Sequence, residues 1–209
     1  RYANAKLPVQ LPGEKDEIVY IPLGAGVVIP PWNFPLAILT GMTVAAVVTG
    51  NTVVLKPSSD SPLIGHKFME IMEETGLPPG VINYVAGPGS EVGDTLVRHP
   101  KTRFVAFTGS MEVGIRINEE AAKVQHGQRW LKRVIAEMGG KDSIIVDRET
   151  NLDEAAAGVT VSAFGFQGQK CSACSRLIVD EQIYDRFVAL LKERAESITV
   201  GQATELTNY

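Results

Sequence analysis

Apolar and polar residues alternate along the chain in two patterns, one typical of buried strands and one typical of helices. Short apolar runs bounded by Gly, Pro or Asn indicate strands, whereas apolar positions that repeat every three to four residues indicate helices. From Gly26 to about Ala122 the two patterns follow each other without interruption. The predicted strands cover residues 26–30, 51–57, 81–85 and 104–107, and the predicted helices cover 36–49, 61–75, 90–98 and 110–122.

Strands that alternate with helices through short loops are typical of a parallel sheet with helices on both faces. We therefore predict an α/β fold with a doubly wound, mainly parallel sheet, followed by the start of a second α/β domain. The expected divisions are an edge or hairpin segment at 1–23, with an edge strand at 17–21, a first domain at 24–138 and a second at 139–209. The later strands are predicted at 130–136, 142–146 and 176–179, and the later helices at 152–164 and 181–198.

Composition narrows the classes of partner. The 209 residues are 44% hydrophobic and 21% charged, and no apolar run reaches the ~18 residues that suggest a membrane span. The formal net charge is -4, and Lys and Arg are scattered rather than clustered. Nucleic acids and anionic membranes bind basic patches. We therefore predict neither a nucleic-acid partner nor a membrane partner.

The cysteines and the chain ends suggest where the protein works and how complete it is. The 2 cysteines lie three positions apart, so they cannot form a disulfide framework, and no signal-peptide pattern opens the chain. A reducing, cytoplasmic compartment is therefore expected. The chain starts at Arg1 rather than Met and stops in a polar stretch directly after a predicted helix, which suggests a fragment of a longer protein.

The stretch from Gly165 to Arg176, GFQGQKCSACSR, is the richest in candidate chemistry. Its glycines and glutamines suit a loop that presents the thiol of Cys171 to a cleft, with Lys170 beside it and backbone N–H groups available for an oxyanion. Alternatively, Cys171 and Cys174 are small buried residues or a redox-active C-x-x-C pair. A zinc site lacks ligands, because there is no second cysteine pair and the histidines are remote in sequence: His66, His99 and His126.

A thiol nucleophile usually needs a base, and Glu137 is the best candidate. The histidines lie in ordinary helix or loop contexts, whereas Glu137 stands between the end of an apolar strand and a Gly-Gly turn. A structural carboxylate has little reason to be there. We expect its surroundings to exclude water, which suits a general base.

Five short motifs follow one another along the chain: PWNFP at 31–35, KPSS at 56–59, FTGS at 107–110, EMGGK at 137–141 and GQKC at 168–171. Each alone is weak evidence, but together, in this order and at this spacing, they resemble the aldehyde dehydrogenase superfamily. The resemblance runs from about Gly24 to Gly201. It implies a Rossmann-like cofactor domain followed by the N-terminal part of a catalytic domain, and an NAD(P)-dependent oxidation of an aldehyde to an acid.

The resemblance also implies roles for three residues. Cys171 would attack the aldehyde and form a thiohemiacetal. Asn33 and the backbone N–H of Cys171 would donate hydrogen bonds to the oxyanion. After hydride has left for the nicotinamide, Glu137 would activate water and hydrolyse the thioester.

The same resemblance implies where the cofactor binds. The usual G-x-G-x-x-G fingerprint is missing, although GPGSEVG at 87–93 resembles it loosely and could equally be a turn that caps a helix. Ser59 stands where many NAD-preferring relatives carry a Glu that repels a 2′-phosphate, which leaves room for NADP, whereas the general resemblance favours NAD. The implied cofactor-binding residues are Lys56, Ser59, Gly89, Gly93, Gly109, Ser110 and Val113.

The segments FGFQGQKCSA at 164–173 and EMGGKD at 137–142 resemble those of the 1-pyrroline-5-carboxylate dehydrogenase subgroup, which oxidises glutamate γ-semialdehyde to glutamate in proline breakdown. The spacer HGQRWLKR at 126–133 supports the same subgroup. By this resemblance Ser172 would bind the α-carboxylate of the substrate and Phe166 would pack on its aliphatic part. Their plainer interpretations are a turn serine and a core aromatic residue.

Two other functions remain open. The protein could be an aldehyde dehydrogenase for another substrate, such as succinate semialdehyde. The chain by itself could also be a nucleotide-binding fragment without turnover, because the family's later cofactor motif, its carboxylate-anchoring loop and its oligomerisation strand would lie beyond Tyr209. A homo-oligomer is expected for the full-length protein.

Overall fold

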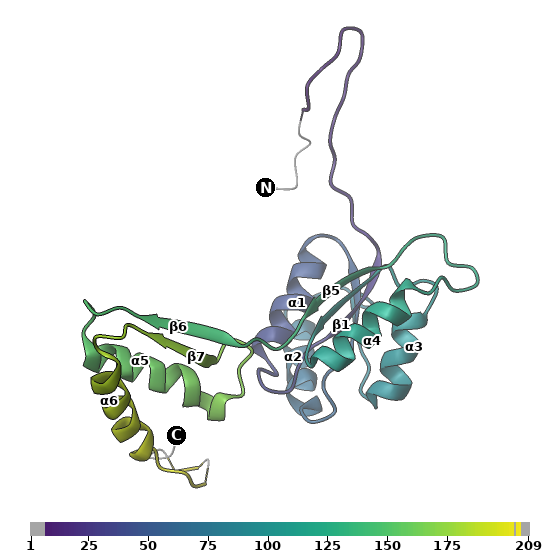
Figure 1. Ribbon diagram of the computed structural model, residues 1–209. Coiled ribbons are helices and arrows are strands. Elements are labelled where there is room, and N and C mark those ends of the chain that lie inside the picture. The colour runs from purple at the N-terminus through teal and green to yellow at the C-terminus, as the bar shows by residue number, and fades with distance from the viewer. Residues whose placement is uncertain (1–6, 203, 206–209) are drawn as a thin grey trace. The chain divides into compact units, whose positions relative to one another are not determined.

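The computed structural model describes residues 7–202 and 204–205. The chain divides into two units, Arg1–Glu137 and Met138–Tyr209, and each contains its own parallel sheet. The purple-to-teal part of Figure 1 is the first unit and the green-to-yellow part is the second. Residues 1–6 of the predicted hairpin segment lie outside the described residues.

The first unit is built on a five-stranded sheet in the order β3-β2-β1-β4-β5, and every neighbouring pair is parallel. The order reverses direction after β3, because β4 returns to the other side of β1. This arrangement confirms the predicted doubly wound sheet. The strands are β1 (Ala25–Ile29), β2 (Thr52–Leu55), β3 (Ile82–Tyr84), β4 (Phe104–Thr108) and β5 (Arg133–Glu137).

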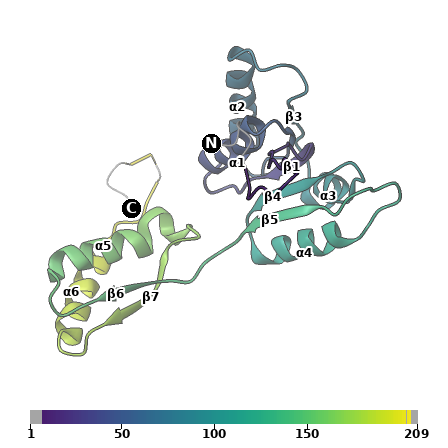
Figure 2. The same ribbon diagram turned by 90° about the horizontal axis from the view of Figure 1, so that it is seen from above.

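Helices cover both faces of this sheet. Figures 1 and 2 show α1 and α2 on one face and α3 and α4 on the other, as right-handed crossovers require. Among the described residues, no helix is both long enough and apolar enough to cross a membrane. The helices are α1 (Ala37–Val48), α2 (Pro62–Glu74), α3 (Asp94–Arg98) and α4 (Met111–Ala122).

The main core of the first unit lies between the sheet and α1 and α2. The central strands are apolar almost throughout because both of their faces are covered, which is why the sequence shows runs rather than alternation. The buried members of this core come from β1, β2, β3, β4 and both helices: Val28, Leu39, Val53, Leu55, Phe68, Ile82 and Ala106.

Gly26 is a position where the sheet depends on the absence of a side chain. It pairs with Phe104 across β1 and β4, and the Phe104 ring occupies the space into which a Cβ at Gly26 would project. Gly26→Ala is therefore expected to lower the free energy of unfolding by roughly 1–3 kcal/mol, measured by urea denaturation of the full-length protein. Gly41→Ala in α1 is the control, because a Cβ there meets nothing within 4 Å; equal losses for the two variants would contradict the prediction.

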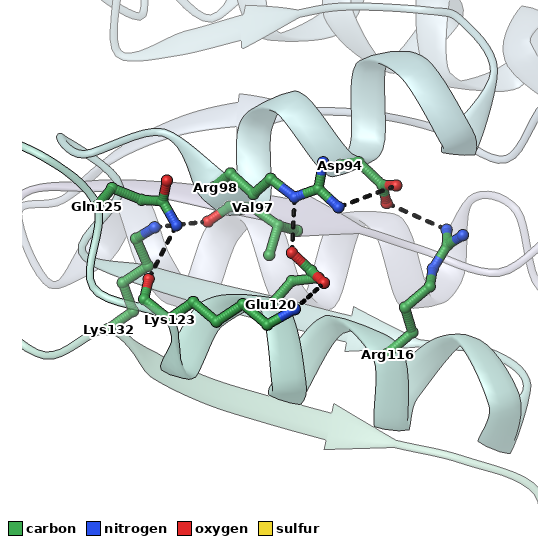
Figure 3. Close-up of polar contacts among 8 residues, drawn as sticks. All are labelled: Asp94, Val97, Arg98, Arg116, Glu120, Lys123, Gln125 and Lys132. Carbon is green, nitrogen blue, oxygen red and sulfur yellow. Dashed lines mark hydrogen bonds and ion pairs between the residues drawn. The ribbon is translucent and has the colours of Figure 1, made fainter.

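A network of charged side chains joins α3 to α4 (Figure 3). Arg98 Nε and Lys123 Nζ each lie 2.6 Å from the Glu120 carboxylate, and Arg116 lies 3.1 Å from Asp94. The hydrogen bonds from Arg98 and then Lys123 lower the pKa of Glu120 to about 2, so this carboxylate stays ionised at neutral pH. The network ties the two helices that cover this face of the sheet to each other.

The second unit pairs β6 (Asp142–Val146) with β7 (Cys174–Val179) in parallel. Helices α5 (Leu152–Phe164) and α6 (Tyr184–Glu196) pack on one face of this strand pair (Figures 1 and 2). The Asn151 side chain caps α5 by accepting from two backbone N–H groups, which satisfies donors that the first turn leaves open. The buried core consists of Val146, Ala156, Val159, Ile183 and Phe187.

Two details of the predicted elements are wrong. Residues 17–21 do not form the expected edge strand: the structure has only a bridge at Ile18, and a single bridge is too short to make a strand ladder. The helix expected from residue 90 begins instead as a π-helical turn, η1 (Gly89–Gly93), which continues into α3. Two glycines within five residues weaken the α-helical pattern there.

Candidate active site

Four of the predicted site residues of the first unit follow the carboxyl ends of its strands. Asn33 lies half-buried in the bend after β1, Lys56 directly follows β2, Gly109 directly follows β4, and Glu137 is the last residue of β5. Because all five strands are parallel, these ends share one edge of the sheet. In doubly wound folds this edge is where ligands bind.

Lys56 is the most unusual polar residue at this edge, because its side chain is only 3% exposed. Its Nζ donates a 2.8 Å hydrogen bond to the carbonyl oxygen of Pro57, and burial lowers the pKa of this amine. The aliphatic part of the side chain passes Gly93, where a Cβ would lie 3.8 Å from both Cδ and Cε. The structure therefore brings together two of the predicted cofactor-binding residues, Lys56 and Gly93.

The turn between β4 and α4 forms a second part of this edge. Gly109 donates its backbone N–H to the carbonyl oxygen of Glu137 at 3.1 Å, which links the ends of β4 and β5. The Ser110 hydroxyl caps α4 by accepting from the Val113 N–H at 3.3 Å. Gly109 cannot carry a Cβ without a clash, because a Phe107 ring carbon would lie 2.6 Å away. A helix N-terminus that opens directly after a strand suits an anionic group.

The remaining predicted residues of this unit are more exposed. Ser59 lies in the turn after β2, and Gly89 opens the π-helical turn. Glu137 is also exposed, so the expected exclusion of water around it is wrong for this chain. The reason is its place at the end of β5, which is the edge strand of the sheet. Its carboxylate is accessible to water.

In the second unit, Cys171 lies half-buried in a turn just before β7. Hydrogen bonds hold the peptide groups on both sides of it. The Ala173 N–H donates to the Lys170 carbonyl at 3.2 Å, and the Gly140 N–H donates to the Cys171 carbonyl at 3.1 Å. The residue types of Gly140 and Ala173 do not indicate this role, because a hydrogen bond between backbone groups leaves no mark in the sequence.

The loop that leads to Cys171 contains a left-handed turn. Phe166 and Gln167 have φ of 54° and 58°, and Gly168 has φ of 69°. Left-handed backbone in two consecutive residues other than glycine is uncommon and costs conformational energy. The 3-10 turn η2 (Gly165–Gly168) contains this turn and is closed by the Gln169 N–H, which donates to the Phe166 carbonyl at 3.0 Å. Strain of this kind is often found at functional sites.

Both predicted substrate-binding residues flank the nucleophile loop with exposed side chains. Phe166 is 48% exposed, so the alternative interpretation of a core aromatic residue is wrong for this chain. Ser172 is an exposed turn residue. Lys170 folds back so that its Nζ lies 3.5 Å from the point where a Cβ of Gly165 would stand. Phe166 and Ser172 are therefore exposed at the surface of the loop.

The two cysteines differ in their surroundings. Both are free thiols, and the Cys174 Sγ donates to the Arg176 carbonyl at 3.3 Å within β7. Cys171 lies in a turn whose two adjoining peptides are fixed. Within the described part of the chain, no group of three or more His, Cys, Asp or Glu residues could hold a metal ion. Cys174 thus lies within a strand, whereas Cys171 lies in a turn.

The model of the aldehyde dehydrogenase family matches residues 1–208. The chain belongs to this family. Aldehyde dehydrogenases with solved structures share its fold. Betaine aldehyde dehydrogenase from Staphylococcus aureus, solved in complex with NAD+, is 33% identical with a TM-score of 0.90 over 98% of this chain and 40% of that one.

The similar proteins include 1-pyrroline-5-carboxylate dehydrogenases. The one from Geobacillus thermodenitrificans is 59% identical over 97% of this chain and 40% of its own length. The structure of 1-pyrroline-5-carboxylate dehydrogenase from Thermus with bound NAD is 55% identical, with a TM-score of 0.89 over 93% of this chain and 38% of that one. The chain therefore spans about 40% of the length of the curated relatives that it matches.

Proposed function

We propose that the full-length protein oxidises L-glutamate γ-semialdehyde, the open form of Δ1-pyrroline-5-carboxylate, to L-glutamate with NAD. One observation supports this choice of substrate. The chain is 59% identical to 1-pyrroline-5-carboxylate dehydrogenase from Geobacillus thermodenitrificans, whereas it is 33% identical to the betaine aldehyde dehydrogenase. The motifs around Cys171 and Glu137 support the same subgroup. The half-buried thiol of Cys171, in a turn with fixed peptides, supports the chemistry.

The residues at the sheet edge fit NAD. The buried ammonium of Lys56 has three donors, of which the described structure pairs one with the Pro57 carbonyl, so the others can serve a ribose hydroxyl. The N-terminus of α4 at Ser110 can hold phosphate oxygens, and Gly93 leaves room beside Lys56. We infer that these groups hold the cofactor together with Ser59, Gly89, Gly109 and Val113.

The first step of the proposed mechanism belongs to Cys171. The thiol gives up its proton to water, its sulfur bonds to the carbonyl carbon of the aldehyde, and the electron pair of the C=O bond moves to the oxygen. The Asn33 side-chain amide and the Cys171 N–H donate to this oxyanion, which stabilises the charge that develops there. The chemistry that bound NAD supplies is the acceptance of hydride from the adduct carbon, which leaves a thioester on Cys171.

The second step belongs to Glu137. Its carboxylate takes a proton from water, and the oxygen of that water bonds to the thioester carbon while the C–S bond breaks. The proton then passes from Glu137 to the sulfur, so the products are the acid and the free thiol.

Ser172 and Phe166 account for the choice of aldehyde in this proposal. The Ser172 hydroxyl donates to the α-carboxylate of the semialdehyde, and the Phe166 ring packs on its methylene groups. Ser172→Ala in the full-length protein should therefore raise KM for glutamate γ-semialdehyde.

A substrate panel tests the proposal. NADH formation by the full-length protein is measured with glutamate γ-semialdehyde, succinate semialdehyde and short aliphatic aldehydes. The proposal expects the highest kcat/KM with glutamate γ-semialdehyde. If succinate semialdehyde or a short aldehyde is preferred, the substrate assignment fails while the family's chemistry stands.

A second candidate function concerns the 209-residue chain alone. Because it covers about 40% of its relatives, it can be a nucleotide-binding fragment without turnover. The test compares NAD affinity and NADH formation for this chain and for the full-length protein. Binding by the chain without NADH formation supports the fragment function, and turnover by the chain contradicts it.

Ser59 provides a prediction about cofactor choice. Ser59→Glu places a carboxylate in the exposed turn after β2, where it would repel the 2′-phosphate of NADP. The ratio of kcat/KM with NAD to that with NADP should rise at least about tenfold, because like charges at close range repel strongly. Thr150→Glu adds the same charge to an exposed turn of the second unit and should leave the ratio unchanged. An unchanged ratio in Ser59→Glu would remove Ser59 from the cofactor site.

The setting of the full-length protein is also proposed. The two free cysteines suit a reducing compartment, which supports the cytoplasm. The family resemblance supports a homo-oligomer. Sedimentation equilibrium of the full-length protein measures the oligomeric state, and a monomer at all concentrations would contradict this part of the proposal.

A further inference from the structure

The backbone of Cys171 is held at two points, which together fix its conformation. The peptide between Lys170 and Cys171 is anchored through the Lys170 carbonyl, which accepts from Ala173 N–H at 3.2 Å. The peptide between Cys171 and Ser172 is anchored through the Cys171 carbonyl, which accepts from Gly140 N–H at 3.1 Å. Because peptide groups are planar, fixing both planes fixes φ and ψ of the residue between them.

This anchoring determines what the nucleophile can do. With φ and ψ fixed, the direction of the Cα–Cβ bond is fixed, and the thiol can move only by rotation about χ1. The Cys171 N–H belongs to the first anchored plane, so its direction is fixed as well. The proposed reaction uses the sulfur and the N–H of Cys171. The positions of both groups therefore depend on these two hydrogen bonds.

Gly140 can make its hydrogen bond only because it has no side chain. A Cβ at this position would lie 2.5 Å from the Cys171 carbonyl oxygen and 3.1 Å from the Asp142 carboxylate, whereas ordinary contacts begin at 3.4 Å. The atom in the way is backbone, so no rotamer change can relieve the clash. The turn that carries Cys171 would have to shift by roughly 1 Å.

We propose that Gly140 is a positioning residue for the nucleophile: its N–H orients the Cys171 carbonyl, and its missing side chain lets the two segments approach. The catalytic consequence of this inference rests on the proposed function, whereas the hydrogen bond from Gly140 to the Cys171 carbonyl does not depend on it. Gly140 follows Glu137 by three residues, so the segment that starts with the proposed base also anchors the nucleophile.

The test compares two adjacent glycines in the full-length protein. Gly140→Ala introduces the clash, whereas in Gly139→Ala the Cβ meets nothing within 4 Å. We expect Gly140→Ala to lower kcat about 100-fold, since a misplacement of about 1 Å costs on this order. KM and the Kd for NAD should change little in either variant; the clash should lower the thermal midpoint of Gly140→Ala by a few degrees, as overpacking does elsewhere, whereas Gly139→Ala should keep its midpoint and at least about a third of the kcat.

The pattern of losses separates positioning from general damage. Loss of kcat in Gly140→Ala alone, at an unchanged NAD affinity and at a temperature well below both thermal midpoints, supports the proposal. Equal losses of kcat in both variants, or loss of NAD affinity together with kcat in Gly140→Ala, overturn it. An active Gly140→Ala protein also overturns it.

A measurement on the unsubstituted protein keeps the proposal testable if Gly140→Ala does not fold. Hydrogen exchange of the Gly140 amide, followed by NMR or by fragmentation mass spectrometry, should be slower than that of the Gly139 amide, because only the former donates to the Cys171 carbonyl. Exchange of the Gly140 amide at the rate of an open loop overturns the contact. Failure of the substrate panel with a protected Gly140 amide would instead overturn the proposed function alone.

Discussion

Replacing Cys171 by Ser in the full-length protein is expected to lower aldehyde oxidation by at least about four orders of magnitude, because loss of a nucleophile leaves only binding and oxyanion stabilisation. A serine hydroxyl is a far weaker nucleophile than a thiol, and the proposed mechanism assigns no base that would activate it. Steady-state NADH formation measures the loss. NAD binding, followed by quenching of protein fluorescence, should be unchanged.

Cys174→Ser is the matched control for this variant. Cys174 lies three residues further along, and its Sγ donates to the Arg176 carbonyl within β7, a hydrogen bond that a serine hydroxyl can keep. Its activity should stay within about twofold of the unsubstituted protein, as for a surface substitution. Residual turnover in Cys171→Ser would exclude the thiol mechanism, and loss of activity in both variants would favour a redox pair.

The second large effect is expected from Glu137→Gln. The amide keeps the size of the side chain but cannot accept a proton from water, so thioester hydrolysis should slow by roughly 10²–10⁴-fold. The attack by Cys171 and the hydride step do not use this proton. Stopped-flow absorbance should therefore show a burst of about one NADH per active site, followed by slow turnover.

The control for this variant is Glu149→Gln, which removes a carboxylate from an exposed turn of the second unit. It should turn over normally without a new burst. Mass spectrometry of Glu137→Gln after the burst should find the acyl group on the peptide that contains Cys171. Slow turnover without a burst would assign Glu137 to an earlier step. Full activity of the variant would remove Glu137 from the mechanism.

The periodicity of the sequence predicted nearly all of the secondary structure, because most elements are long or fully buried. The apolar runs of β1, β2 and β4 and the helical repeats of α2, α5 and α6 are strong patterns, and each element lies within a few residues of its predicted range. The segment at 17–21 shows the limit. Its alternation predicts a strand, yet only Ile18 forms a bridge, because strand formation depends on tertiary context that local sequence does not specify.

The candidate site was predictable only in part. The motifs identified which residues follow the strand ends, because in a parallel sheet those ends share one edge. The left-handed turn at Phe166 and Gln167 was not predictable, since only Gly, Asn and Asp signal this conformation by type. The exposure of Glu137 likewise depends on β5 being the edge strand, which its own sequence does not reveal.

The parallel pairing of β6 and β7 has a consequence for how the enzyme acquires its reactive thiol. The two strands are joined through α5, so Asp142 pairs with Cys174 only after a long crossover has closed. Contacts between residues so distant in sequence form slowly and late in folding. The turn that holds Cys171 directly precedes β7, and its anchor at Gly140 lies two residues before β6. The orientation of the proposed nucleophile is thereby tied to a long-range closure within its unit, and the thiol has no fixed direction until the two strands have paired.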